Sequence, residues 1–133
     1  MYGEDMGERY GPYKLTSEIA IRFNGDIYEA LNRALKKLET SSKEDVKTIT
    51  QAFARKLIRT YYSMVMVRSQ IWTTRLHEQS EVFIQHFPEK ESIIRTLLNW
   101  IDEPPTNKED VYELFKSEGE WASANFSNEA KIR

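Results

Sequence analysis

Residues 43–76 read KEDVKTITQAFARKLIRTYYSMVMVRSQIWTTRL and keep one apolar period throughout. Apolar side chains recur every three or four residues, the spacing that places them on one face of an α-helix. The members of this arc are Val46, Ile49, Phe53, Leu57, Tyr61, Met64, Ile71 and Trp72. Just before it, Ser42 and Asp45 resemble a capping box in which aspartate replaces the usual glutamate or glutamine. The stretch predicts one long central helix, from Lys43 to about Leu76, in a mainly α-helical fold.

The same stretch is basic. Between Val46 and Leu76 the sequence has six Lys or Arg residues and no Asp or Glu. Such asymmetry fits a basic patch for nucleic acid or an acidic partner, and it also fits the commoner case, a solvated face balanced by acidic neighbours in the fold. Arg68 projects among the apolar residues, so its guanidinium must either reach water along its packed stem or pair with a carboxylate of another chain.

An Asn-Gly pair precedes an earlier helix. Residues 23–39 read FNGDIYEALNRALKKLE, with apolar residues at helical spacing from Ile27 to Leu38. We therefore predict a helix over residues 27–38, with Asn24 or Asp26 placed to cap its first exposed backbone N–H groups. Residues 2–12 contain three glycines and a proline, and they predict only a weak or broken helix.

A further helix is predicted after Phe87, because proline at position 88 suits a first helical turn. Its apolar residues are Ile93, Ile94, Leu97, Leu98 and Ile101, with Trp100 beside them. The sequence DEPP at residues 102–105 ends this helix and resembles a linker.

The pattern of the remaining residues is ambiguous. Thr106 and Glu109 fit a capping box, which would start a helix with Val111, Leu114 and Phe115 facing inward. Residues 110–116 and 120–126 also fit two short strands around Ser-Glu-Gly at 117–119.

Composition and motifs exclude several classes of function. The chain has 133 residues, a formal net charge of −2 and no cysteine, so a single intracellular domain without disulfides or zinc–cysteine sites is expected. No apolar run approaches the length of a membrane span. His77 and His86 have no second ligand at metal-site spacing, and Gly3, Gly7 and Gly11 do not form a phosphate loop. We expect no catalytic, cofactor-binding or metal-binding residues, and hence no enzymatic activity.

Several features, taken in order along nearly the whole chain, resemble one family. They are MYG at residues 1–3, FNGDI at 23–27, the pairs Tyr61-Tyr62 and Val67-Arg68 followed by Trp72, the prolines at 104 and 105, and VYELFKSEGEW at 111–121. This order is similar to the first Psf (partner of Sld five) subunit family of the GINS complex. The resemblance implies a helical A domain, residues 1–103, and a linker with a short, partial, β-containing B domain, residues 104–133. The tail would then be strands.

The resemblance also implies a scaffold role in DNA replication initiation and fork progression, in the nucleus. The partners would be three sister GINS subunits, the MCM ring with a RecJ-like helicase cofactor, and polymerase epsilon, with DNA contacted only indirectly and no membrane. The apolar arc of the long helix exceeds half its circumference and few other elements are available to cover it, so we expect an obligate interface. The expected subunit-interface residues are Phe23, Arg55, Arg59, Tyr61, Met64, Arg68, Ile71 and Trp72. The expected docking segment comprises Val111, Leu114, Gly119, Glu120 and Trp121.

Two other functions remain open from the sequence. A helical nucleic-acid-binding protein, such as a filament coat or a small subunit of an RNA-guided complex, would place Arg55, Lys56 and Arg59 on phosphates. Its affinity would fall steeply with salt. A self-associating bundle without a replication role is the other possibility.

Overall fold

The computed structural model describes residues 26–130, with side chains described as far as residue 125. The order of elements is α2 (Ile27–Glu39), α3 (Lys43–Ser69), α4 (Leu76–His86), the short 3-10 helix η2 (Pro88–Lys90), α5 (Glu91–Asp102) and α6 (Lys108–Ala130). The expectation of a mainly α-helical fold is confirmed for this part of the chain. Phe23, Asn24 and residues 2–12 lie outside the described residues.

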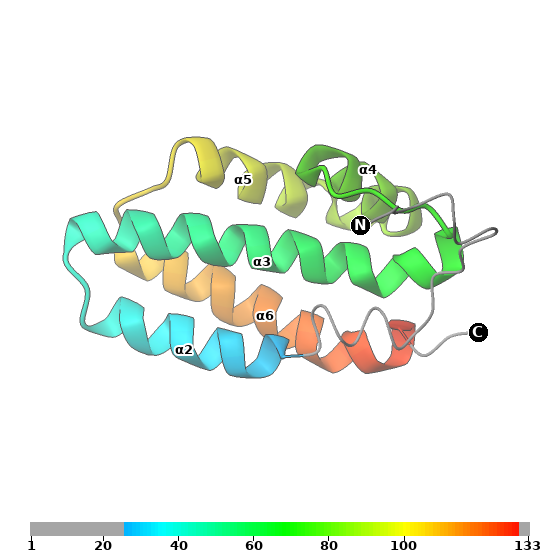
Figure 1. Ribbon diagram of the computed structural model, residues 1–133. Coiled ribbons are helices and arrows are strands. Elements are labelled where there is room, and N and C mark those ends of the chain that lie inside the picture. Colours follow the sequence, from blue (N-terminus) through cyan, green and yellow to red (C-terminus); the bar gives the residue numbers. More distant parts are fainter. Residues whose placement is uncertain (1–25, 131–133) are drawn as a thin grey trace, which may run out of the picture.

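Helix α3 is the centre of the bundle. It contacts all four other α-helices, with α2 and α6 on one side and α4 and α5 on the other (Figure 1). Every residue from 60 to 66 is buried, which requires neighbours around the whole circumference of the helix. The expectation that few elements cover its apolar arc is therefore wrong, because the bundle itself covers the arc.

The start of α3 is as predicted, and its end is not. Ser42 Oγ accepts a 3.3 Å hydrogen bond from the Asp45 backbone N–H, as in the expected capping box. The helix ends at Ser69, well before the expected Leu76, because Gln70 adopts the left-handed conformation (φ 55°). The Gln70 N–H closes the last turn on the Met66 carbonyl at 2.9 Å. Ile71 and Trp72 therefore lie in the α3–α4 connection and not on the helical arc.

Helix α2 begins where the sequence predicts, at Ile27. Asp26 occupies the N-cap position, but its side chain makes no capping hydrogen bond. Its carboxylate instead accepts a 2.6 Å bond from Lys56 Nζ of α3, which lowers the pKa of Asp26. Asp26 thus links two helices.

Helix α5 also follows the prediction, with proline at position 88 opening η2 just before it. Ile94 and Leu97 are fully buried, while Trp100 lies partly buried against Phe115 of α6, with ring centroids 5.9 Å apart.

The C-terminal residues form a helix, so the predicted strands at 110–116 and 120–126 are wrong for the described residues. Val111, Phe115 and Ala122 are fully buried, and this spacing of four and seven residues places them on one helical face. Asn107 Oδ1, not Thr106, accepts hydrogen bonds from the backbone N–H groups of the first turn, at 3.0 and 3.1 Å. The short β-containing segment is not found in this part of the chain.

Helix α6 shares the core of the other helices. The Phe115 ring packs on Phe53 of α3 with centroids 4.8 Å apart, and residues 103–107 connect α5 to α6. The expected domain division at residues 103 and 104 stays a prediction, but the described residues on both sides of it share one hydrophobic core. Among the described helices, none is both long enough and apolar enough to cross a bilayer.

Candidate functional site

Two large apolar side chains are exposed at the end of α3. Ile71 is 46% exposed and Trp72 is 45% exposed, although both are of the kind that a folded core normally buries. Arg68 and Arg75, on either side of them in the sequence, are exposed as well. We call these four residues the Trp72 surface. An exposed aromatic and aliphatic pair flanked by arginines has the composition of a protein-binding surface.

The Trp72 surface is held by side-chain hydrogen bonds beneath it. Tyr62 Oη donates to the Ile71 carbonyl at 2.5 Å and accepts from the Thr73 N–H at 3.2 Å. Gln79 Nε2 of α4 donates to the Thr73 carbonyl at 2.9 Å. Burial raises the pKa of the Tyr62 phenol, so its hydroxyl stays protonated and remains a donor at neutral pH. The connection is therefore fixed to α3 and α4 on its inner side.

A buried polar cluster lies deeper in the bundle. Glu118 Oε1 of α6 accepts a 2.6 Å hydrogen bond from Tyr61 Oη and a 3.0 Å bond from Lys90 Nζ of η2. The Lys90 ammonium also lies 4.0 Å from the centroid of the Trp121 ring, a cation–π contact. Burial, and then the negative charge of Glu118, raise the pKa of Tyr61 well above its ordinary value. The carboxylate is thus paired and the phenol neutral, an arrangement that stabilises helix packing.

Aromatic rings connect this cluster to the Trp72 surface. Trp121 makes an edge contact with Phe87 at 5.6 Å between centroids, and Phe87 stacks on Phe83 at 4.9 Å. The guanidinium carbon of Arg68 lies 6.0 Å from the centroid of Phe87. Arg68, one of the predicted interface residues, therefore lies over the Phe87 ring of its own chain, and its side chain is still exposed.

The predicted interface residues divide into two groups. Tyr61 and Met64 are fully buried in the core of the chain itself, so a partner cannot touch them unless the bundle opens. Arg55 is exposed on α3, whereas Arg59 is partly buried and donates to Gln79 Oε1 at 3.4 Å. Arg68, Ile71 and Trp72 lie together at the end of α3. Their role in an interface stays a prediction, as does that of Phe23, which is outside the described residues.

The predicted docking segment packs mostly inward. Val111 and Gly119 are buried, Leu114 and Trp121 are partly buried, and Glu120 is exposed and pairs with Lys116 at 3.2 Å. The backbone of Gly119 lies so close to α2 that a Cβ there would be 2.5 Å from Leu31 Cδ1. In this structure the segment mainly forms a helix–helix contact.

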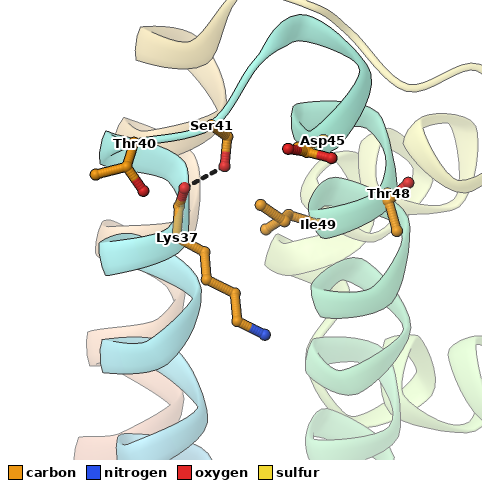
Figure 2. A pocket seen from close by; sticks show the side chains of 6 residues that line it. All are labelled: Lys37, Thr40, Ser41, Asp45, Thr48 and Ile49. Carbon is orange, nitrogen blue, oxygen red and sulfur yellow. Dashed lines mark hydrogen bonds between the residues drawn. The ribbon is translucent and has the colours of Figure 1, made fainter.

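A groove that the sequence analysis missed lies between α2 and α3. Two adjoining hollows, of about 360 and 280 Å³, share Lys37, Thr48 and Ile49 in their lining. Figure 2 shows the larger of the two. Figure 2 shows the Lys37 side chain extending along the groove from α2, with Ile49 reaching toward it from α3. The signal in the sequence lies in two sets of residues at helical spacing: residues 30, 33, 34 and 37 are Ala, Arg, Ala and Lys, and residues 49, 52, 53 and 56 are Ile, Ala, Phe and Lys.

The described part of the chain contains no cluster of side chains suited to hold a metal ion. No group of three His, Asp or Glu residues there is close enough to hold a metal ion. His77 is exposed, and His86 Nδ1 lies 3.1 Å from the Val82 carbonyl within α4.

The sequence matches no family model, and comparison with curated proteins and with solved structures finds no match.

Proposed function

We propose that this protein is a non-enzymatic helical scaffold that binds a partner protein through the Trp72 surface. The observation that carries the proposal is the exposure of Ile71 and Trp72 between two arginines, on a connection fixed by Tyr62. Tryptophan and arginine are the usual energetic anchors of protein interfaces, and a preorganised segment loses little conformational entropy on binding.

The bundle covers its own core, so the proposed partner adds to a folded subunit. The apolar residues of α3 up to Met66 pack against α2, α4, α5 and α6. We therefore place the contact on exposed side chains at the end of α3, and not on the buried residues Tyr61 and Met64.

The specific form of the proposal follows the resemblance to the GINS family. In that form the chain is one of four subunits in a nuclear complex that holds the replicative helicase together, with the MCM ring, a RecJ-like cofactor and polymerase epsilon as further partners. The long central helix and the exposed Arg68 and Trp72 support it. The described residues contribute no β-containing docking domain, so the proposal concerns assembly of the helical part.

Two of the three cations that a nucleic-acid-binding function would use have partners within the chain. Lys56 Nζ pairs with Asp26 at 2.6 Å, and Arg59 donates to Gln79. These contacts favour the scaffold function over phosphate binding by the α3 face.

The test is native mass spectrometry of material purified from the source cells through a tag on this chain. We expect three small co-purifying subunits at equal stoichiometry, and their loss with Trp72→Ala or Arg68→Glu. Tyr28→Ala, which removes another exposed aromatic ring, and Lys43→Glu, which reverses another exposed cation, are the matched controls.

The possible outcomes test three parts of the proposal separately: the scaffold function, the role of the Trp72 surface and the GINS form. If other proteins co-purify and their binding depends on Trp72, the scaffold function stands and the GINS form is overturned. Full assembly of folded Trp72→Ala and Arg68→Glu variants would overturn the role of the Trp72 surface. A lone chain that binds single-stranded nucleic acid with a steep salt dependence would overturn the scaffold function itself.

A further inference from the structure

The groove between α2 and α3 lies away from the Trp72 surface, toward the other end of α3. The groove is lined along α3 by residues from Asp45 to Lys56, whereas the Trp72 surface begins at Arg68. At 1.5 Å per helical residue, Ala52 and Arg68 are about 24 Å apart along the axis. We propose that this groove binds an acidic amphipathic helix of a partner protein, a second contact that goes beyond the scaffold function proposed above.

The floor of the groove is apolar, and three of its residues are alanines. Ala30 and Ala34 of α2 face Ile49, Ala52 and Phe53 of α3. Because alanine side chains are small, the surface between the two helices is concave where longer side chains would have filled it. A concave apolar strip between two helices is the shape into which the apolar ridge of a third helix packs.

The walls of the groove are cationic. Arg33, Lys37 and Lys56 line the more apolar hollow, and no carboxylate lines it. Lys56 is already paired with Asp26 at 2.6 Å, whereas Arg33 is only 3.9 Å from Asp26 and highly exposed. Lys37 makes no ion pair with any residue of the described chain. Arg33 and Lys37 are thus the two cations available to a ligand.

The remaining polar groups lie at the end near the α2–α3 connection. Thr40, Ser41 and Asp45 line only the larger hollow, and Ser41 Oγ donates to the Lys37 carbonyl (Figure 2). Asp45 is the one carboxylate in the lining of the two hollows, and it would repel an acidic residue placed there. A ligand should therefore present its acids beside Arg33 and Lys37 and a neutral residue beside Asp45.

The spacing of the two cations defines the ligand further. Arg33 and Lys37 are four residues apart on one helix, so their side chains stand about one turn, or about 5.4 Å, apart along the axis. Two carboxylates three or four residues apart on a partner helix have the same spacing. The occupant is therefore an amphipathic helix with an apolar ridge and, beside it, two acids one turn apart.

Helix α6 of a second copy, the most acidic candidate, does not offer such a surface in its described residues. The exposed positions of α6 include Glu109, Glu113 and Glu120, but its apolar residues Val111 and Phe115 are buried in its own bundle. A lipid surface would need apolar side chains that protrude, whereas those of the groove floor lie between two walls. A helix from another protein is the occupant that fits both the shape and the charge.

The test is fluorescence anisotropy with the full chain and a labelled synthetic helix. The probe is a peptide of about 16 residues (about 24 Å as a helix) with a leucine ridge and two flanking glutamates four residues apart. Its counterpart has lysine in place of both glutamates. We expect binding of the glutamate peptide alone, weakened about fivefold to tenfold by Lys37→Glu, which removes one attraction and adds one repulsion.

The controls use residues outside the groove. Lys36→Glu makes the same charge change one position away on α2 but off the groove lining, and it should leave affinity unchanged. Ala52→Trp should abolish binding by filling the groove, while Gln85→Trp on the exposed side of α4 should not. The lysine peptide should bind Lys37→Glu better than it binds the original chain.

Several results would overturn the proposal: no binding of the glutamate peptide, equal binding of both peptides, or equal effects of Lys36→Glu and Lys37→Glu. Binding to vesicles of anionic phospholipid that Ala52→Trp abolishes would assign the groove to membranes instead. Concentration-dependent dimerisation that Ala52→Trp abolishes would assign it to a second copy. Trp72→Ala should not alter peptide binding, so failure of the groove and failure of the Trp72 surface are distinguishable.

Discussion

Tyr61 Oη and Lys90 Nζ meet at one oxygen, Oε1 of Glu118, at 2.6 and 3.0 Å. The three residues come from α3, η2 and α6, so this oxygen joins elements that are far apart in sequence. The Lys90 side chain is only 15% exposed, and the Glu118 side chain still less. A charge pair this deeply buried is weak evidence for stability as a whole, but removing one partner is costly.

Replacing the acid alone should therefore destabilise the bundle strongly. Glu118→Leu leaves the Lys90 ammonium without its carboxylate and Tyr61 Oη with only the backbone carbonyl of residue 118, now at 3.3 Å. We expect a loss of about 3 kcal/mol in the free energy of unfolding, measured by urea denaturation. The double variant Lys90→Met/Glu118→Leu should regain part of the lost free energy of unfolding, because it no longer buries an unpaired ammonium. A double variant no more stable than the single one would show that the unpaired ammonium is not the cause.

The buried phenol predicts sensitivity to alkali. Burial and the neighbouring Glu118 raise the pKa of Tyr61 in the folded state, whereas the unfolded chain titrates near the ordinary value of about 10. The stabilisation is therefore complete below about pH 10 and is lost as the pH rises from there toward the folded pKa. The free energy of unfolding should fall by up to about 1.4 kcal/mol per pH unit above that point.

Tyr61→Phe isolates this effect. Urea denaturation at a series of alkaline pH values should give a shallower fall for Tyr61→Phe than for the original chain. Tyr28→Phe, at an exposed position, should leave the slope unchanged. Equal slopes for all three proteins would assign the alkaline loss to other groups.

Two buried threonines of α3 allow the free-energy cost of an unpaired hydroxyl to be measured by comparison. Both are fully buried, but Thr60 Oγ1 donates to the Lys56 carbonyl at 2.8 Å, whereas Thr50 Oγ1 has no hydrogen-bond partner within the described part of the chain. Thr50→Val should stabilise the protein by about 1 kcal/mol, and Thr60→Val should destabilise it by a similar amount. Thermal or urea denaturation measures both; a loss in Thr50→Val would indicate a bound water on that hydroxyl.

At position 119 we expect the usual preference of a helix for alanine over glycine to be reversed. Glycine inside a helix normally costs about 1 kcal/mol relative to alanine, so Gly→Ala should stabilise α6. At this position the new Cβ would lie 2.5 Å from Leu31 Cδ1 and 3.1 Å from its Cγ, so the buried Leu31 side chain would have to shift. Overpacking of this kind costs about 1–3 kcal/mol, so we expect Gly119→Ala to be destabilising.

Shortening Leu31 provides the control. In a Leu31→Ala background the contact is removed, and Gly119→Ala should then become neutral or stabilising. A double-mutant cycle on urea denaturation gives the coupling between the two positions directly. A coupling near zero would mean that α2 and α6 adjust their separation freely.

Local patterns predicted α2, the start of α3 and α5, because each of these patterns is contained in one segment, whereas α4 was not predicted. The capping box at Ser42 and the apolar faces of α2 and α5 depend on residues a few positions apart. The end of α3 was missed because a left-handed Gln70 has no signal in the sequence, glycine being the residue that usually marks this conformation.

The C-terminal residues show the limit of such patterns. Val111 and Phe115 fit a helix, and the flanking hydrophobic residues also fit strands, so the pattern alone did not decide. In the fold, Phe115 packs on Phe53, and this contact favours the helix over the strands. The two residues are distant in sequence, so a local pattern does not contain this information. For the same reason Tyr61 and Met64 were predicted to face a partner, since the helices that bury them could not be placed from the sequence. The resemblance that favoured strands was misleading here.

The candidate sites were predictable to different degrees. Ile71 and Trp72 were named as interface residues from the sequence, but as part of a helix and not of a fixed connection. The α2–α3 groove depends on two helices lying side by side, although the small residues Ala30, Ala34 and Ala52 that form it are visible in each segment separately.

The position of α6 has a consequence for biosynthesis. Helices α2 and α3 are synthesised before α6, which carries the side chains that cover their inner faces, Val111, Phe115 and Ala122. A nascent chain that has reached only α5 presents an uncovered apolar seam, the kind of surface that invites aggregation or chaperone binding. This protein should therefore complete its folding only after translation has passed α6, and early termination before Lys108 should yield an aggregation-prone fragment, not a smaller folded domain.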